Sequence, residues 1–115
     1  MMLIVSITFY SCNNEDMDLT GNLRFDATSG LSNKGEYQIY TELAGVTVGV
    51  NDLSSATAIK DGKYIDEVVV KDLNQGAYFL KITLDEYKTG YVLLQITGGK
   101  TTTVKLIGNK IIIED

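Results

Sequence analysis

Apolar and polar residues alternate through most of this chain from Leu19 onward, and this alternation constrains the fold more than any other feature. In Leu23–Thr28, leucine, phenylalanine and alanine occupy every second position, and arginine, aspartate and threonine lie between them. Successive side chains of a β-strand point to opposite faces, so this pattern predicts a strand with one buried face. The sequence contains no stretch with the sustained spacing of an amphipathic helix. We therefore expect an all-β domain.

Turn-forming residues divide the alternating segments at short intervals. Gly98-Gly99 lies between two strongly alternating segments and predicts a tight β-hairpin, because glycine readily adopts the backbone angles of such turns. Asp61-Gly62 predicts another turn, and Asp52–Ile59 predicts an irregular segment with one helical turn at most. Val46, Val48 and Val50 are expected to be the inward residues of a strand. The other expected strands cover approximately 23–28, 37–43, 67–71, 77–84, 91–97 and 101–107, with a further hairpin at Gly108-Asn109 leading into 111–113.

Short strands separated by turns predict an antiparallel β-sandwich of about seven strands, or a partly open barrel. Residues 19–115 are enough for one domain, and no linker or internal repeat divides them. The single cysteine allows no disulfide within the chain, so the domain must be stabilised by packing. The expected core consists of Val48, Tyr78, Leu80, Ile82, Val92, Leu94, Ile96, Val104 and Leu106.

The N-terminal segment predicts export and lipid attachment. An apolar run over residues 1–10 is followed by Ser11, by the only cysteine, Cys12, and by an acidic stretch. This order is typical of a lipoprotein signal peptide (1–11), a lipidated cysteine and a short linker (12–18). The run is too short for a transmembrane helix, but it could instead be a first core strand with a buried thiol. The segment around Cys12 resembles the relaxed lipoboxes of Bacteroidota surface lipoproteins, which implies a lipid-anchored protein of the outer membrane or cell surface.

Four segments, in the same order along the chain, resemble carboxypeptidase regulatory-like domains. Leu43–Val48 is similar to their "PLAGATV" turn and strand, Lys60–Tyr64 to their "DADGRF" turn, Leu73–Leu80 to "LPPGTYTL", and Gly90-Tyr91 to a following "GY" pair. The resemblance implies a prealbumin-like (transthyretin-like) sandwich, a fold shared with pilin-type surface modules. It also implies a structural spacer or a binding module rather than an enzyme.

Composition excludes most catalytic chemistry. The sequence has no histidine, which removes Ser-His, Cys-His and His-bearing metal sites. It contains no phosphate-binding glycine loop and no calcium-loop pattern, so neither a cofactor nor a metal ion is expected. A net charge of −5 argues against binding to nucleic acid. We expect no enzymatic activity.

Three aromatic residues are the candidate ligand-binding residues. The expected strand registers place Tyr40, Phe79 and Tyr91 on otherwise polar strand faces, where exposed rings could bind a sugar or a protein. Alternatively, such residues stabilise the outer face of a sheet as cross-strand pairs, or both faces of the sheet are partly buried. Two functions follow: a non-catalytic envelope lipoprotein that binds a polysaccharide or protein partner, or a spacer or assembly subunit of a larger outer-membrane complex. An exposed aromatic cluster would favour the first, and an exposed apolar sheet edge would favour the second.

Overall fold

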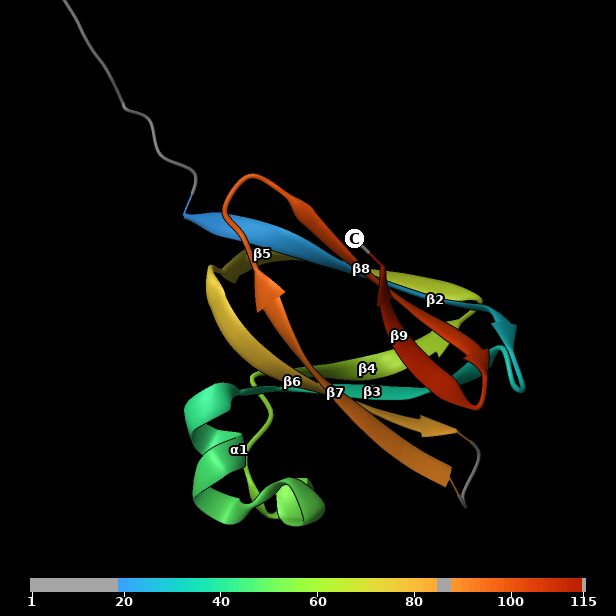
Figure 1. Ribbon diagram of the computed structural model, residues 1–115, viewed down its shortest axis with the longest axis horizontal. Coiled ribbons are helices and arrows are strands. Elements are labelled where there is room, and N and C mark those ends of the chain that lie inside the picture. The colour runs from blue at the N-terminus through green and yellow to red at the C-terminus, as the bar shows by residue number, and fades with distance from the viewer. Residues whose placement is uncertain (1–18, 85–87, 115) are drawn as a thin grey trace, which may run out of the picture.

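The computed structural model describes residues 19–84 and 88–114, which form two packed layers of four strands each (Figure 1). The predicted all-β sandwich is confirmed, with eight described strands rather than about seven. The elements in chain order are β2 (Thr20–Gly30), β3 (Lys34–Thr41), α1 (Glu42–Val48), η1 (Val50–Ser55), β4 (Lys60–Ile65), β5 (Glu67–Asn74), β6 (Gly76–Leu84), β7 (Lys88–Ile96), β8 (Thr101–Gly108) and β9 (Lys110–Glu114).

The strands are joined in the order β7-β6-β3-β4-β5-β2-β8-β9. The first four form one layer and the last four form the other. A single pairing, Ile65 with Glu67, connects the layers where β4 turns into β5. β2 and β8 run parallel, whereas the other paired strands run antiparallel. The predicted antiparallel pairing is therefore confirmed for six of the seven strand pairs and is wrong for β2 with β8.

The hairpin predicted at Gly98-Gly99 is also wrong. β7 and β8 are not hydrogen-bonded neighbours, because β7 pairs with β6 while β8 pairs with β2 and β9. The connecting segment instead crosses from one layer to the other and binds the start of β2. The N–H of Gly99 donates to the carbonyl of Thr20, and the N–H of Asn22 donates to the carbonyl of Lys100, each at 2.9 Å. The hairpin predicted at Gly108-Asn109 is confirmed by the antiparallel pairing of β8 with β9.

The core lies between the two layers and follows the predicted alternation. The inward side chains of β2, which are Leu23, Phe25 and Ala27, are at most 1% exposed. Among the predicted core residues Val92 is only partly buried, and Val48 lies outside the core because it belongs to α1. The other predicted core residues are all buried: Tyr78, Leu80, Ile82, Leu94, Ile96, Val104 and Leu106.

The strand predicted around Val46 is a helix, and the structure shows why. The Thr41 hydroxyl accepts a hydrogen bond from the N–H of Ala44 at 3.2 Å, which caps the first turn of α1. Gly49 ends the helix with a φ of 92°, a conformation that glycine adopts without steric cost. Val46 points outward and is 65% exposed. The capping interactions therefore favour a helix in this segment over the strand that the alternating valines predict.

Two segments that carried the resemblance to carboxypeptidase regulatory-like domains have other conformations than it implied. Leu43–Val48 lies in α1 rather than in a turn and strand. Lys60–Tyr64 lies within β4, so the turn predicted at Asp61-Gly62 is wrong; both residues pair with β3. In the Leu73–Leu80 segment, Leu73 and Asn74 end β5, and Gln75 alone separates them from the predicted strand, β6.

Candidate binding surfaces

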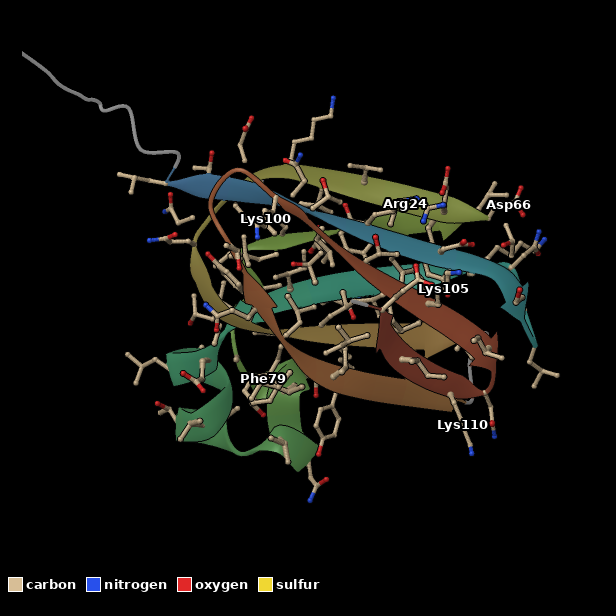
Figure 2. The ribbon with its side chains drawn as sticks, turned by 45° about the horizontal axis from the view of Figure 1, so that its top comes forward. Arg24, Asp66, Phe79, Lys100, Lys105 and Lys110 are labelled. Carbon is tan, nitrogen blue, oxygen red and sulfur yellow. The ribbon has the colours of Figure 1, made fainter. Side chains whose placement is uncertain are left out.

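Two of the three candidate aromatic residues are buried. Tyr40 and Phe79 are cross-strand partners on the outer face of β3 and β6, where they are 3% and 5% exposed. They form a small second core with Leu53 of η1, at the place where α1 and η1 meet the sheet (Figure 2). Burial, with the nearby charge of Asp61 as a smaller contribution, raises the pKa of Tyr40. The interpretation of these two rings as exposed binding platforms is therefore wrong, and the alternative, a cross-strand aromatic pair on a face that is partly buried, is confirmed for them.

The burial is caused by helix α1, which the alternating pattern did not predict and which packs on Phe79. Gly45, the buried residue of α1, faces the Phe79 ring so closely that a Cβ atom there would lie 2.3 Å from Phe79 Cδ2. Only a residue without a side chain allows this approach. A capping signal was present in the sequence: Thr41 precedes Glu42, an acidic residue in the first helical turn, and Gly49 follows the last turn.

Tyr91 is the one candidate aromatic residue that is exposed, at 44%. It lies on β7, and its ring packs edge-to-face against Phe79 with a centroid distance of 6.1 Å. Its exposed side opens into a pocket of about 260 Å³ between η1 and the outer face of β6 and β7, which we call the Tyr91 pocket. The lining residues are Val50, Asn51, Leu53, Ser54, Lys81, Thr89 and Tyr91.

A second candidate surface is the open side of the sandwich between β7 and β9, which we call the β7–β9 seam. These strands end the sheet order, so in the described part of the chain neither pairs with a strand on its outer edge. The strands come close at Gly90, where a Cβ atom would lie 2.9 Å from Ile111 Cδ1. Further along, the Thr102 hydroxyl of β8 donates to the carbonyl of Gln95 at 2.8 Å.

A groove of about 580 Å³ lies along the seam. Its apolar lining comes from Leu93 and Leu94 on β7, Ile113 on β9 and Ala77 on β6. The polar lining consists of Glu42, Gln95, Thr97, Lys100, Thr101, Thr102 and Glu114. The groove therefore combines apolar side chains with two strand edges that pair with no other described strand; on the β7 edge, the Gln95 carbonyl is already bonded to Thr102.

Ile113 shows that the core is incompletely covered at this seam. It pairs with Val104, a fully buried core residue, so its side chain lies on the inner face of its layer. It is nevertheless 37% exposed. On the opposite side of the sandwich, where β4 and β5 meet, the inward residues Tyr64 and Val70 are only 3% and 6% exposed.

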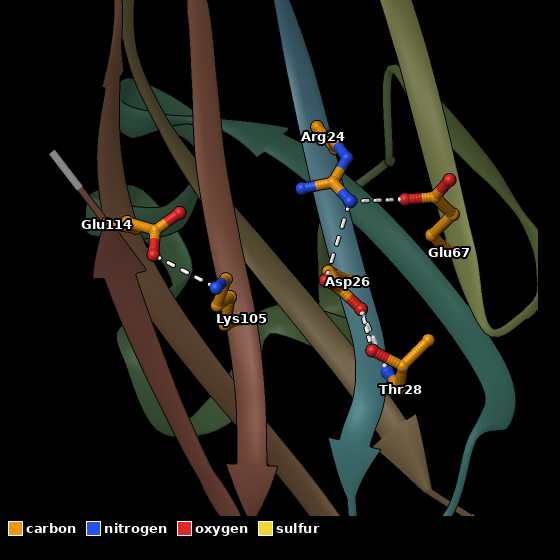
Figure 3. Close-up of polar contacts among 6 residues, drawn as sticks. All are labelled: Arg24, Asp26, Thr28, Glu67, Lys105 and Glu114. Atoms are coloured by element: carbon orange, nitrogen blue, oxygen red, sulfur yellow. Dashed lines mark hydrogen bonds and ion pairs between the residues drawn. The ribbon is translucent and has the colours of Figure 1, made fainter.

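The outer face of the layer formed by β5, β2, β8 and β9 carries charged side chains of opposite sign that pair with one another (Figure 3). Arg24 lies between two carboxylates, with Nη2 2.6 Å from Glu67 Oε2 and 3.4 Å from Asp26 Oδ2. Lys105 Nζ lies 3.0 Å from Glu114 Oε2. Exposed pairs of this kind contribute about 0–1 kcal/mol each and leave little net charge for a ligand. This face has the character of a solvated sheet surface.

Asp26 is also held by Thr28, whose hydroxyl and backbone N–H donate to Asp26 Oδ1 at 2.6 and 2.9 Å (Figure 3). The hydrogen bond from the Thr28 hydroxyl makes the largest contribution to lowering the pKa of Asp26, and the bond from the Thr28 N–H makes the next largest. Burial raises this pKa, and the charges of Arg24 and Lys105 lower it further. The resulting stabilisation is present above the ordinary aspartate pKa and is lost as the pH falls below it.

Within residues 19–84 and 88–114, no group of three or more aspartate, glutamate, histidine or cysteine side chains is arranged to hold a metal ion. No helix in this described part is long and apolar enough to cross a membrane. Cys12, the signal peptide over 1–11 and the linker over 12–18 lie outside the described residues. Comparison with known proteins gives no assignment, since no protein-family model, no curated protein and no solved structure matches this chain.

Proposed function

We propose that this chain is a non-catalytic assembly subunit of the cell envelope, which binds an extended strand of a protein partner along the β7–β9 seam. The observation that carries the proposal is the exposed inner-face residue Ile113 beside the outer edges of β7 and β9, with which no other strand of residues 19–84 and 88–114 pairs. The burial of Tyr40 and Phe79 removes the exposed aromatic cluster that would have favoured a broad ligand platform. The apolar edge is the feature expected of an assembly subunit.

Backbone geometry favours a strand as the occupant. A free edge presents a row of N–H and C=O groups that an added strand can pair with, and the side-chain pockets then select the partner's alternate residues. β9 has five residues and so offers an edge of about 17 Å. Leu93, Leu94 and Ile113 line the groove beside it, which suits a partner strand with apolar residues at every second position.

The proposal predicts cross-links from both edges of the seam to one partner segment. A photoreactive amino acid at Leu93 or at Ile113, in cells that produce the full chain, should give the same cross-linked peptide, identified by mass spectrometry. That peptide should show apolar residues at alternate positions. Ile65, which is 69% exposed at the β4–β5 turn, is the matched control position and should give no such product.

The variant Ile113→Lys should reduce this cross-link at Leu93 about tenfold or more, because a bound strand would bury the new ammonium group. Ile65→Lys should leave it unchanged. Ile113 is partly exposed, so Ile113→Lys should remain folded, as checked by circular dichroism. Equal yields at Leu93 and Ile65, unrelated peptides from the two edges, or cross-links only to a second copy of this chain would each contradict the proposal.

The envelope location in this proposal depends on Cys12. The short apolar run, Cys12 and the acidic residues after it support a lipid-modified N-terminus. The described domain is joined to this segment at Leu19, whose carbonyl accepts from the N–H of Gln75 at 2.9 Å. Leu19 therefore lies at the end of the sandwich that also holds the 97–100 crossover, where the carbonyl of Thr20 binds the N–H of Gly99.

We expect the wild-type protein to partition into detergent and to incorporate labelled fatty acid, and Cys12→Ala to lose both properties. The reason is that two or more acyl chains hold a protein on a membrane almost irreversibly, whereas an unmodified domain of this charge has no comparable anchor. Phase partitioning and metabolic labelling measure the two properties. Retention of label and of membrane attachment in Cys12→Ala would show that the cysteine is not the anchor.

A further inference from the structure

The Tyr91 pocket is a second site, separate from the β7–β9 seam, and its aromatic wall is held in a fixed position. Phe79 packs edge-to-face behind the Tyr91 ring, and Phe79 is itself buried against Leu53 and α1. Leu53 also lines the pocket directly. An exposed ring supported in this way can stack on a ligand with little loss of side-chain entropy.

Polar side chains reach this pocket from two elements. Asn51 and Ser54 come from η1, whereas Lys81 and Thr89 come from β6 and β7. In the described residues, none of these four side chains makes a hydrogen bond or an ion pair, so their donors and acceptors are available to a ligand. Lys81 and Tyr91 are direct cross-strand partners, so their side chains leave the same face of the sheet side by side.

The pocket chemistry combines an aromatic face, amide and hydroxyl groups, and a single positive charge. Among the described residues that line the pocket, none carries a carboxylate. Aromatic faces stack on the apolar side of a sugar ring, neutral hydrogen-bonding groups bind its hydroxyls, and an ammonium group binds a carboxylate. The volume of about 260 Å³ lies just below the range of about 300–1,000 Å³ for drug-sized ligands, which suits one sugar ring.

From this combination we propose that the Tyr91 pocket binds a uronic acid residue, a sugar ring that carries one carboxylate. Tyr91 stacks on the ring, Lys81 pairs with the carboxylate, and Asn51, Ser54 and Thr89 bind the hydroxyls. A single lysine in a chain of net charge −5 favours a ligand with one negative charge over a polyphosphate or a nucleic acid. The site would attach the subunit to an acidic polysaccharide independently of the strand-binding seam.

Calorimetric titration of the full chain in detergent with a galacturonate trisaccharide, and with the neutral galactose trisaccharide, tests this proposal. The acidic trisaccharide should bind, and the neutral one should bind about tenfold more weakly or worse because it cannot use the charge of Lys81. Lys81→Met should abolish the difference between the two sugars. Tyr91→Ala should weaken binding of both.

Lys63→Met is the matched control, because Lys63 is an exposed lysine on β4 that does not line the Tyr91 pocket. It should leave both affinities unchanged. Asn51→Ala provides a second test on η1 if Tyr91→Ala changes the fold, which circular dichroism would detect. Absence of binding at millimolar sugar, equal affinity for both trisaccharides, or unchanged affinity in both Lys81→Met and Asn51→Ala would overturn the proposal.

Discussion

Replacement of Leu80 by alanine should lower the free energy of unfolding by about 2–5 kcal/mol. Leu80 is 1% exposed at the centre of β6, where it pairs with Ile39 on one side and Val92 on the other. Its removal leaves a cavity in a core that lies between two rigid layers and cannot close around it. Urea unfolding followed by circular dichroism measures the change as a lower midpoint with an unchanged slope.

Leu93→Ala is the matched control for this experiment, because Leu93 is a leucine on the adjacent strand β7 and is 46% exposed. Its loss should cost clearly less than that of Leu80, since nearly half of the Leu93 surface stays in contact with water after folding. Equal costs at Leu80 and Leu93 would show that the core does not lie between the two layers as described.

Gly45→Ala should destabilise the protein by about 1–3 kcal/mol, as overpacking does in a well-packed core. The direction of this effect is the informative part. In an ordinary exposed helix, alanine in place of glycine stabilises by about 0.5–1 kcal/mol. Here the added Cβ atom would lie 2.3 Å from Phe79 Cδ2, and the Phe79 ring is confined between Leu53 and Tyr91. Urea unfolding gives the sign.

Displacement of α1 in this variant should also expose Tyr40, which tyrosine fluorescence quenching by acrylamide would detect. Val46→Ala is the control in the same helix, because Val46 is 65% exposed and makes no part of the small second core. It should change stability by less than about 0.5 kcal/mol. A more stable Gly45→Ala protein would mean that α1 does not pack on Phe79.

The candidate site was only partly predictable, because the outer face of the layer formed by β7, β6, β3 and β4 is buried in one part and exposed in another. The alternation correctly placed Tyr40, Phe79 and Tyr91 on that face, opposite the core residues of the same strands. It could not reveal that α1 covers two of these rings, because the valines around Val48 alternate as in a strand. The Tyr91 pocket was not predictable either, since four of its seven lining residues come from η1.

The β7–β9 seam could not be predicted either, because it depends on which strands are neighbours in the sheet. Gly98-Gly99 has the local sequence of a hairpin, and a hairpin there would have paired β7 with β8 and left no open edge between them. Instead β8 pairs with β2, which lies more than seventy residues earlier in the chain, and β7 is left at the end of the sheet. Two exposed edges on the same side of the sandwich result from that one long-range pairing.

The sequence by itself determined the all-β class, the inward face of β2, β6, β7 and β8, and seven of the nine residues expected in the core, because side-chain alternation is a local consequence of strand geometry. Only the tertiary structure decided which strands are neighbours, which outer residues are covered, and where the core stays open. Those outcomes depend on contacts between distant segments, such as Gly45 with Phe79 and β2 with β8, whose energies are absent from any local pattern.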